Sequence, residues 1–71
     1  MNIQLETYLF DNIRDTQSLH VEAMLPRNVI MHMIDEGMIA SAKQAWRTLE
    51  KWNRKGLYEY GVSLDLGWKL V

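Results

Sequence analysis

The chain has 71 residues, of which 48% are hydrophobic and 24% charged, and its formal net charge is −1. This length predicts one small domain spanning residues 1–71. A domain of this size has little room for a deep substrate cleft, so an enzyme is not expected. The absence of cysteine excludes disulfides, zinc–thiolate sites and thiol catalysis.

Targeting and membrane signals are not evident in the sequence. No apolar run approaches the ~20 residues that a membrane helix needs. The first six residues, MNIQLE, contain no basic side chain and no long apolar stretch, so a signal peptide is not expected. These features favour a cytoplasmic location and no membrane partner.

The first predicted element is a helix over residues 3–14. Leu5, Leu9 and Ile13 recur every four residues, and Tyr8 falls on the same side, which is the pattern of a helix with one buried face.

Between the first and second predicted helices, residues 15–18 are polar and predict a turn. A period of two follows over residues 19–25, which predicts a short extended segment: Leu19, Val21, Ala23 and Leu25 alternate with His20, Glu22 and Met24. Its extended geometry suits the residue before Pro26, and proline is well tolerated in the first turn of a helix.

A second helix is predicted over residues 26–36. Its apolar residues recur at intervals of three and four, and Gly37 supplies the left-handed residue that commonly ends a helix. Together the apolar side chains span too wide an arc for one buried stripe, so part of this helix is expected to expose apolar surface, as in a dimer seam. These side chains are Val29, Ile30, Met31, Met33 and Ile34.

The third predicted helix, residues 42–55, has the clearest boundaries. Ser41 is placed to cap its first turn, and Gly56 follows its last turn. The face expected to be buried comprises Ala42, Ala45, Trp46, Leu49, Trp52 and Asn53.

The remaining residues predict a β-hairpin. Two runs rich in aromatic residues, 57–61 and 66–71, are separated by a loop of about four residues, 62–65. We expect Trp46 and Trp68 to pack in the core between the third helix and this hairpin. Tyr58 and Tyr60 share one face of their strand.

The segment from Ser41 to Gly61, SAKQAWRTLEKWNRKGLYEYG, resembles the recognition helix and first wing strand of the winged helix-turn-helix superfamily. With the order of the elements, the resemblance implies an α+β fold, a three-helix winged-helix-like domain with a C-terminal β-hairpin. It also implies a small DNA-binding protein, such as a transcriptional regulator, that reads DNA with the helix at 42–55. Two features depart from the pattern. Met33 replaces the usual small residue of the preceding helix, and the wing tip at 62–65 has no arginine or lysine.

The placement of the basic residues agrees with this reading. Residues 1–40 carry six acids and two bases, whereas residues 41–71 carry six bases and three acids. Four of these bases recur along one stripe of the third helix, where lysine and arginine can neutralise phosphates. Arginine and glutamine can also make paired hydrogen bonds to base edges. The predicted DNA-binding residues are Arg27, Lys43, Gln44, Arg47, Thr48, Lys51, Arg54 and Lys69.

Two other interpretations of the same residues stay open. An exposed helix face is ordinarily charged, and Glu50 is placed to pair with Arg47 or Arg54. Winged-helix scaffolds also serve as protein–protein interaction modules, so an accessory or inhibitory protein is the alternative function.

A homodimer is expected for specific DNA binding, because one unit this small offers few contacts.

Metal and cofactor signals are weak. His20 and His32 are the only histidines, and acids such as Asp35 lie near the second of them. Ordinary surface or half-buried histidines explain this pattern better than a metal site. We therefore expect neither metal nor cofactor.

Overall fold

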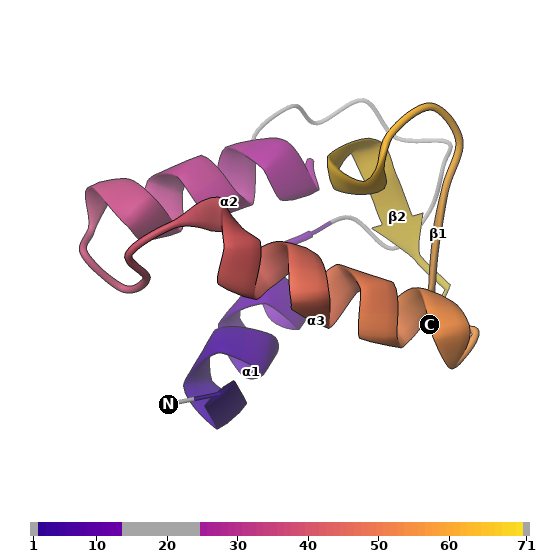
Figure 1. Ribbon diagram of the computed structural model, residues 1–71, viewed down its shortest axis with the longest axis horizontal. Helices are drawn as coiled ribbons and strands as arrows, with labels where there is room; N and C mark the ends of the chain where they lie inside the picture. Colours follow the sequence, from indigo (N-terminus) through magenta and orange to yellow (C-terminus); the bar gives the residue numbers. More distant parts are fainter. Residues whose placement is uncertain (1, 14–24, 71) are drawn as a thin grey trace.

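The computed structural model describes residues 2–13 and 25–70, and it contains three helices and a two-stranded antiparallel hairpin (Figure 1). The predicted turn at 15–18 and the extended segment at 19–24 lie outside the described residues. In chain order the elements are α1 (Asn2–Asn12), α2 (Pro26–Asp35), α3 (Ala42–Arg54), β1 (Tyr58–Tyr60), the short 3-10 helix η2 (Leu64–Leu66) and β2 (Gly67–Lys69). The predicted α+β class and order of elements are confirmed for this part of the chain.

The boundaries of α2 follow from proline and glycine. Leu25 is extended (φ −68°, ψ 140°), as expected before a proline, and Pro26 occupies the first turn. At the other end, Gly37 has φ +75°. The Met38 amide donates to the carbonyl of Met33 (2.8 Å), which pairs a carbonyl that the helix itself leaves unbonded.

The boundaries of α3 are close to those predicted. Ser41 occupies the N-cap position, but its side chain makes no capping hydrogen bond, so the predicted cap is right in place and wrong in its contact. Gly56 has φ +76° at the end of the helix. The Leu57 amide then donates to the carbonyl of Trp52 (2.9 Å), which turns the chain from α3 into β1.

The hairpin is shorter in its strands and longer in its loop than the sequence predicts. Tyr58 pairs with Lys69, and Tyr60 pairs with Gly67. Residues 61–66 connect the strands, and they include η2 in place of the simple four-residue loop expected. The hydroxyl of Tyr58 accepts a hydrogen bond from the Gly67 amide (3.0 Å) and donates to the carbonyl of Leu64 (2.5 Å). These bonds explain why the loop turns inward and why Tyr58 is buried.

The core lies where the three helices meet one another and the hairpin. Leu5, Leu9 and Ile13 are buried as predicted, whereas Tyr8 is only partly buried. Phe10 packs edge-on against Trp52, with ring centroids 5.4 Å apart and planes at 89°. Each buried aliphatic side chain of such a core contributes roughly 1.5–3 kcal/mol. The buried hydrophobic residues are Leu5, Leu9, Ile13, Val29, Ile30, Met33, Ile39, Ala45, Leu49, Trp52 and Tyr58.

The buried face of α3 differs from the predicted one at three positions, and one of them is Asn53, which was expected to be buried but is exposed. Trp46 was expected in the core but is 43% exposed, whereas Thr48 was expected on the surface but is only 7% exposed. The hydroxyl of Thr48 donates to the carbonyl of Gln44 (3.2 Å), so its polar atom is satisfied inside the helix. Trp68, the second tryptophan expected in the core, is half-buried.

Candidate functional site

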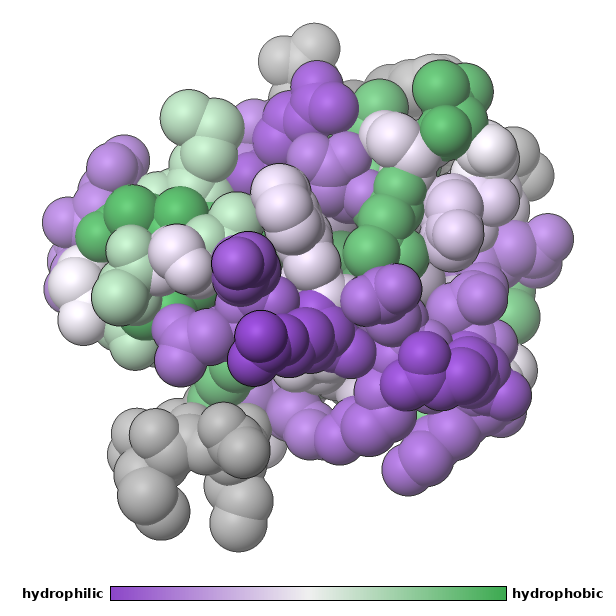
Figure 2. Space-filling view, in the orientation of Figure 1, coloured by the Kyte–Doolittle hydropathy of each residue, from purple (hydrophilic) through white to green (hydrophobic). Residues whose placement is uncertain are grey.

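The outer face of α3 carries several exposed polar and charged side chains. Figure 2 shows a mainly hydrophilic band where α3 crosses the view. Lys43, Arg47 and Arg54 are exposed on this helix. Within residues 5–13 and 25–70 none of the three forms an ion pair or a side-chain hydrogen bond, so their charges are available to an external anion.

Glu50 does not neutralise these cations. Its side chain is exposed on the same helix, yet the ion pairs formed among the described residues join other partners, Arg27 with Asp65 and Lys51 with Glu6. The predicted pairing of Glu50 with Arg47 or Arg54 is therefore not found there. Gln44 is also exposed, and its amide can both donate and accept hydrogen bonds.

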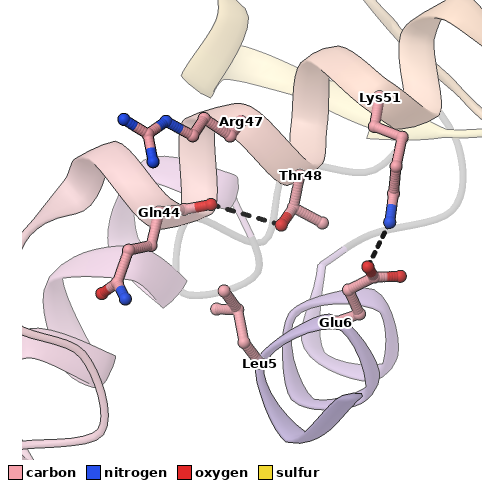
Figure 3. A pocket seen from close by; sticks show the side chains of 6 residues that line it. All are labelled: Leu5, Glu6, Gln44, Arg47, Thr48 and Lys51. Atoms are coloured by element: carbon pink, nitrogen blue, oxygen red, sulfur yellow. Dashed lines mark hydrogen bonds and ion pairs between the residues drawn. The ribbon is translucent and has the colours of Figure 1, made fainter. Parts of the chain in front are cut away.

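Lys51 lies at the edge of this face and is already engaged. Its ammonium group is paired with the carboxylate of Glu6 on α1, and both side chains are partly exposed (Figure 3). In the same view the guanidinium of Arg47 extends along α3, away from Glu6. Lys51 is therefore less available to an external anion than Lys43 or Arg47.

Thr48 does not belong to the exposed face. Because it is buried and bonded to Gln44, the prediction that it faces a partner's surface is wrong. Its hydroxyl group is used within α3 itself.

Two further predicted residues, Arg27 and Lys69, hold the domain together. The guanidinium of Arg27 donates two hydrogen bonds to the carboxylate of Asp65, at 3.0 and 3.3 Å. Lys69 donates to the carbonyl of Phe10 (2.5 Å), and its ammonium group lies 4.5 Å from the centre of the Phe10 ring. Both cations would have to leave these contacts to reach a phosphate, so the structure does not gather them with the free bases of α3.

The Arg27–Asp65 ion pair shifts the pKa of both groups. The hydrogen bond from Arg27 lowers the pKa of Asp65, and the hydroxyl of Ser63, 2.9 Å from the same carboxylate, acts in the same direction. Burial opposes this shift without reversing it. The same contact raises the pKa of Arg27 above its already high ordinary value, so both groups are charged at neutral pH.

A shallow hollow of about 250 Å³ is lined by residues of α1 and α3 (Figure 3). Its rim is polar and includes the Glu6–Lys51 ion pair. That ion pair balances its own charge, so Arg47 is the one charged group of the lining that forms no ion pair within the described residues. The residues lining it are Leu5, Glu6, Gln44, Arg47, Thr48 and Lys51.

Trp46 is the residue of the exposed face that sequence reasoning missed. It lies three positions after Lys43 and four before Glu50, both of which are exposed. Residues at these spacings are neighbours on a helix surface. Its exposure could have been predicted from its position around the helix, because Trp46 lies about 100° from the buried residue Ala45.

Apolar side chains are also exposed on α2 and in the turn that follows it. Met31 and Ile34 are exposed, as the wide apolar arc of the predicted second helix implies, and Met38 in the turn after α2 is exposed as well. In Figure 2 apolar surface gathers at the carboxyl end of α2 and the turn after it. Met33, in contrast, is fully buried and fills the core.

Neither a metal-binding cluster nor a membrane-spanning helix is found in the residues that the structure describes. No group of three or more histidine, aspartate or glutamate side chains in residues 5–13 and 25–70 is arranged to hold a metal ion. His32 stacks on Tyr8 with ring centroids 6.5 Å apart, and His20 lies outside the described residues. None of the helices described is both long and apolar enough to cross a membrane.

Comparisons of the chain with protein-family models, with curated proteins and with solved structures find no match. The function is therefore inferred from the geometry and chemistry of the surface itself.

Proposed function

We propose that this domain is a winged-helix DNA-binding module of the kind found in small transcriptional regulators. In this proposal α2 and α3 form the helix-turn-helix, and the β1–β2 hairpin serves as the wing. The observation that carries it is the exposed face of α3. Lys43 and Arg47 form no ion pair within the described residues, and the neutral side chain of Gln44 is exposed beside them. A recognition helix contacts base edges mainly through its N-terminal residues, and these three lie in that half of α3.

Each of these side chains has a specific role on a duplex. Arg47 can donate two hydrogen bonds to the O6 and N7 atoms of guanine, and Gln44 can pair with the N6 and N7 atoms of adenine. Lys43 and Arg54 neutralise phosphates on either side of the groove, which fixes the register of the helix. Buried Thr48 has no part in this interface, and Arg27 and Lys69 keep their structural contacts.

The number of free cations limits the affinity of a single domain. Each neutralised phosphate contributes about −0.9 to the slope of log K against log salt. A domain with only a few such contacts binds DNA weakly, so specific binding calls for two domains on two half-sites. A homodimer on a palindromic site fits this requirement.

The test is a fluorescence-polarisation titration of a labelled mixed-sequence duplex at low and physiological salt. Arg47→Ala is expected to weaken binding by about tenfold or more and to reduce the salt slope by about 1. The matched control is Lys55→Ala, which removes the same charge just beyond the other end of α3 and is expected to change affinity little. Equal effects of the two variants, or no binding by the unmodified protein at low salt, would refute the proposal.

A specific observation supports a second candidate, a protein–protein interaction module. Met31, Ile34 and Met38 are exposed, and flexible methionine side chains adapt well to partner surfaces. Two double variants distinguish DNA binding from binding of a partner protein. Met31→Ser with Met38→Ser should abolish binding of a partner protein and preserve the DNA complex, whereas Lys43→Ala with Arg47→Ala should have the opposite effect.

A further inference from the structure

Trp46 is an exposed aromatic residue on a face that is otherwise polar. Its side chain is 43% exposed, whereas Trp52, six residues later on α3, is 4% exposed and packs in the core. Trp46 is also absent from the partly buried side chains packed against that core. Among the residues that the structure describes, the indole ring of Trp46 is therefore not part of the core.

The neighbours of Trp46 indicate the chemistry of a partner. Lys43 lies three residues before it and Glu50 four residues after it, which makes both neighbours of Trp46 on the helix surface, and Arg47 directly follows it in sequence. Lys43 and Arg47 form no ion pair within the described residues, and these two cations outnumber the one exposed acid. A partner that covers the indole must also accommodate these two positive charges. A polyanion with an apolar group close to its charged backbone meets both conditions.

Duplex DNA offers one such apolar group on its major-groove base edges, the C5-methyl of thymine. We infer that Trp46 contacts a thymine methyl group and so makes this domain prefer thymine at one position of its site. This inference rests on the proposed DNA-binding function. Arg47, next in sequence, supplies hydrogen bonds to a neighbouring base, so polar and apolar readout are adjacent on the helix.

The test uses two labelled duplexes that differ only in that methyl group, one of alternating dA–dT and one of alternating dA–dU. The unmodified protein is expected to bind the thymine duplex about three- to tenfold more tightly. Trp46→Ala should bring the ratio of affinities close to one, and Trp46→Phe should retain part of the preference. Met31→Ala, which removes an exposed apolar side chain from α2, serves as the matched control and should keep the full preference.

The possible failures are distinguishable. Equal affinity of the unmodified protein for the two duplexes, or a preference that survives in Trp46→Ala, would overturn the inference and leave DNA binding intact. Tighter binding to single-stranded oligothymidine than to either duplex would also overturn it, because that result indicates base stacking on the indole. No binding to any of these probes at low salt would remove the proposed function itself.

Discussion

Arg27 and Asp65 are 38 residues apart in sequence, yet their side chains share two hydrogen bonds, from Nε at 3.0 Å and from Nη2 at 3.3 Å. This paired contact fastens the first turn of α2 to η2 in the hairpin loop. It uses both oxygens of the carboxylate, which gives the contact a fixed geometry. The orientation of the hairpin relative to the helix pair therefore depends on the charge of Asp65.

Stability is expected to fall in acid partly through this carboxylate. The pKa of Asp65 is lower in the folded chain than in the unfolded chain, mainly because of the hydrogen bond from Arg27. Such a group stabilises the fold above its unfolded pKa of about 3.9, and this contribution is lost as the pH falls through the lower folded value. Urea unfolding of Asp65→Asn and of the unmodified protein should therefore differ at neutral pH and converge in acid. A constant difference across the pH range would contradict this expectation.

Tyr58→Phe should destabilise the domain although it removes only one oxygen atom. The buried hydroxyl bonds to both the Gly67 amide and the Leu64 carbonyl, and its loss leaves these groups unpaired. The expected cost is about 1–3 kcal/mol. Tyr60→Phe is the matched control, because Tyr60 lies on the same strand but is exposed, and its change should stay within about 0.5 kcal/mol. Equal unfolding midpoints for the two variants would show that the hydroxyl of Tyr58 does not hold the loop.

Gly67→Ala should be the more damaging of two glycine substitutions in the hairpin. A Cβ atom at Gly67 would collide with the backbone carbonyl of Glu59 and would lie 2.5 Å from the hydroxyl oxygen of Tyr58. Neither contact can relax without moving the strand, so we expect a loss of about 2–3 kcal/mol. A Cβ atom at Gly61 meets nothing within 4 Å, so Gly61→Ala should be nearly neutral in the same thermal unfolding measurement. Similar melting temperatures for the two variants would argue against this close packing.

The Glu6–Lys51 ion pair should reduce the affinity of α3 for DNA. Glu6→Gln frees the ammonium group of Lys51 and is expected to tighten binding by up to about fivefold, as for a partly exposed ion pair. Asp11→Asn removes one exposed acid from the same helix without breaking this pair and is the control. If the two variants tighten binding equally, the effect reflects net charge and not the release of Lys51.

The helices are predictable from sequence because their signals are local. Leu9 and Ile13 recur at helical spacing, and Gly37 and Gly56 stand where left-handed residues end α2 and α3. The exchange of Trp46 and Thr48 shows the limit of reasoning from hydrophobicity. Position 48 lies about 40° from the edge of the arc set by Ala45, Leu49 and Trp52, whereas position 46 lies about 60° from its other edge, so helical phase outweighs the apolar character of each residue.

The candidate site is less predictable, because the availability of each cation depends on partners distant in sequence. Lys43 and Arg47 are exposed as expected. Lys51, in contrast, meets Glu6, which is 45 residues away, and Lys69 meets Phe10, which is 59 residues away. A helical pattern shows which face a lysine occupies, and it contains no information about which other segment packs beside that face.

The contact of Lys69 with the carbonyl of Phe10 has a consequence for the order of folding. It joins residues 59 positions apart, whereas α3 packs against β1 and η2, which follow it closely in sequence. Closing such a long loop costs more chain entropy than forming the turns after α2 and α3. We therefore expect α1 to dock after α3 and the hairpin have packed together. Leu9→Ala should then accelerate unfolding while leaving the refolding rate nearly unchanged in stopped-flow kinetics.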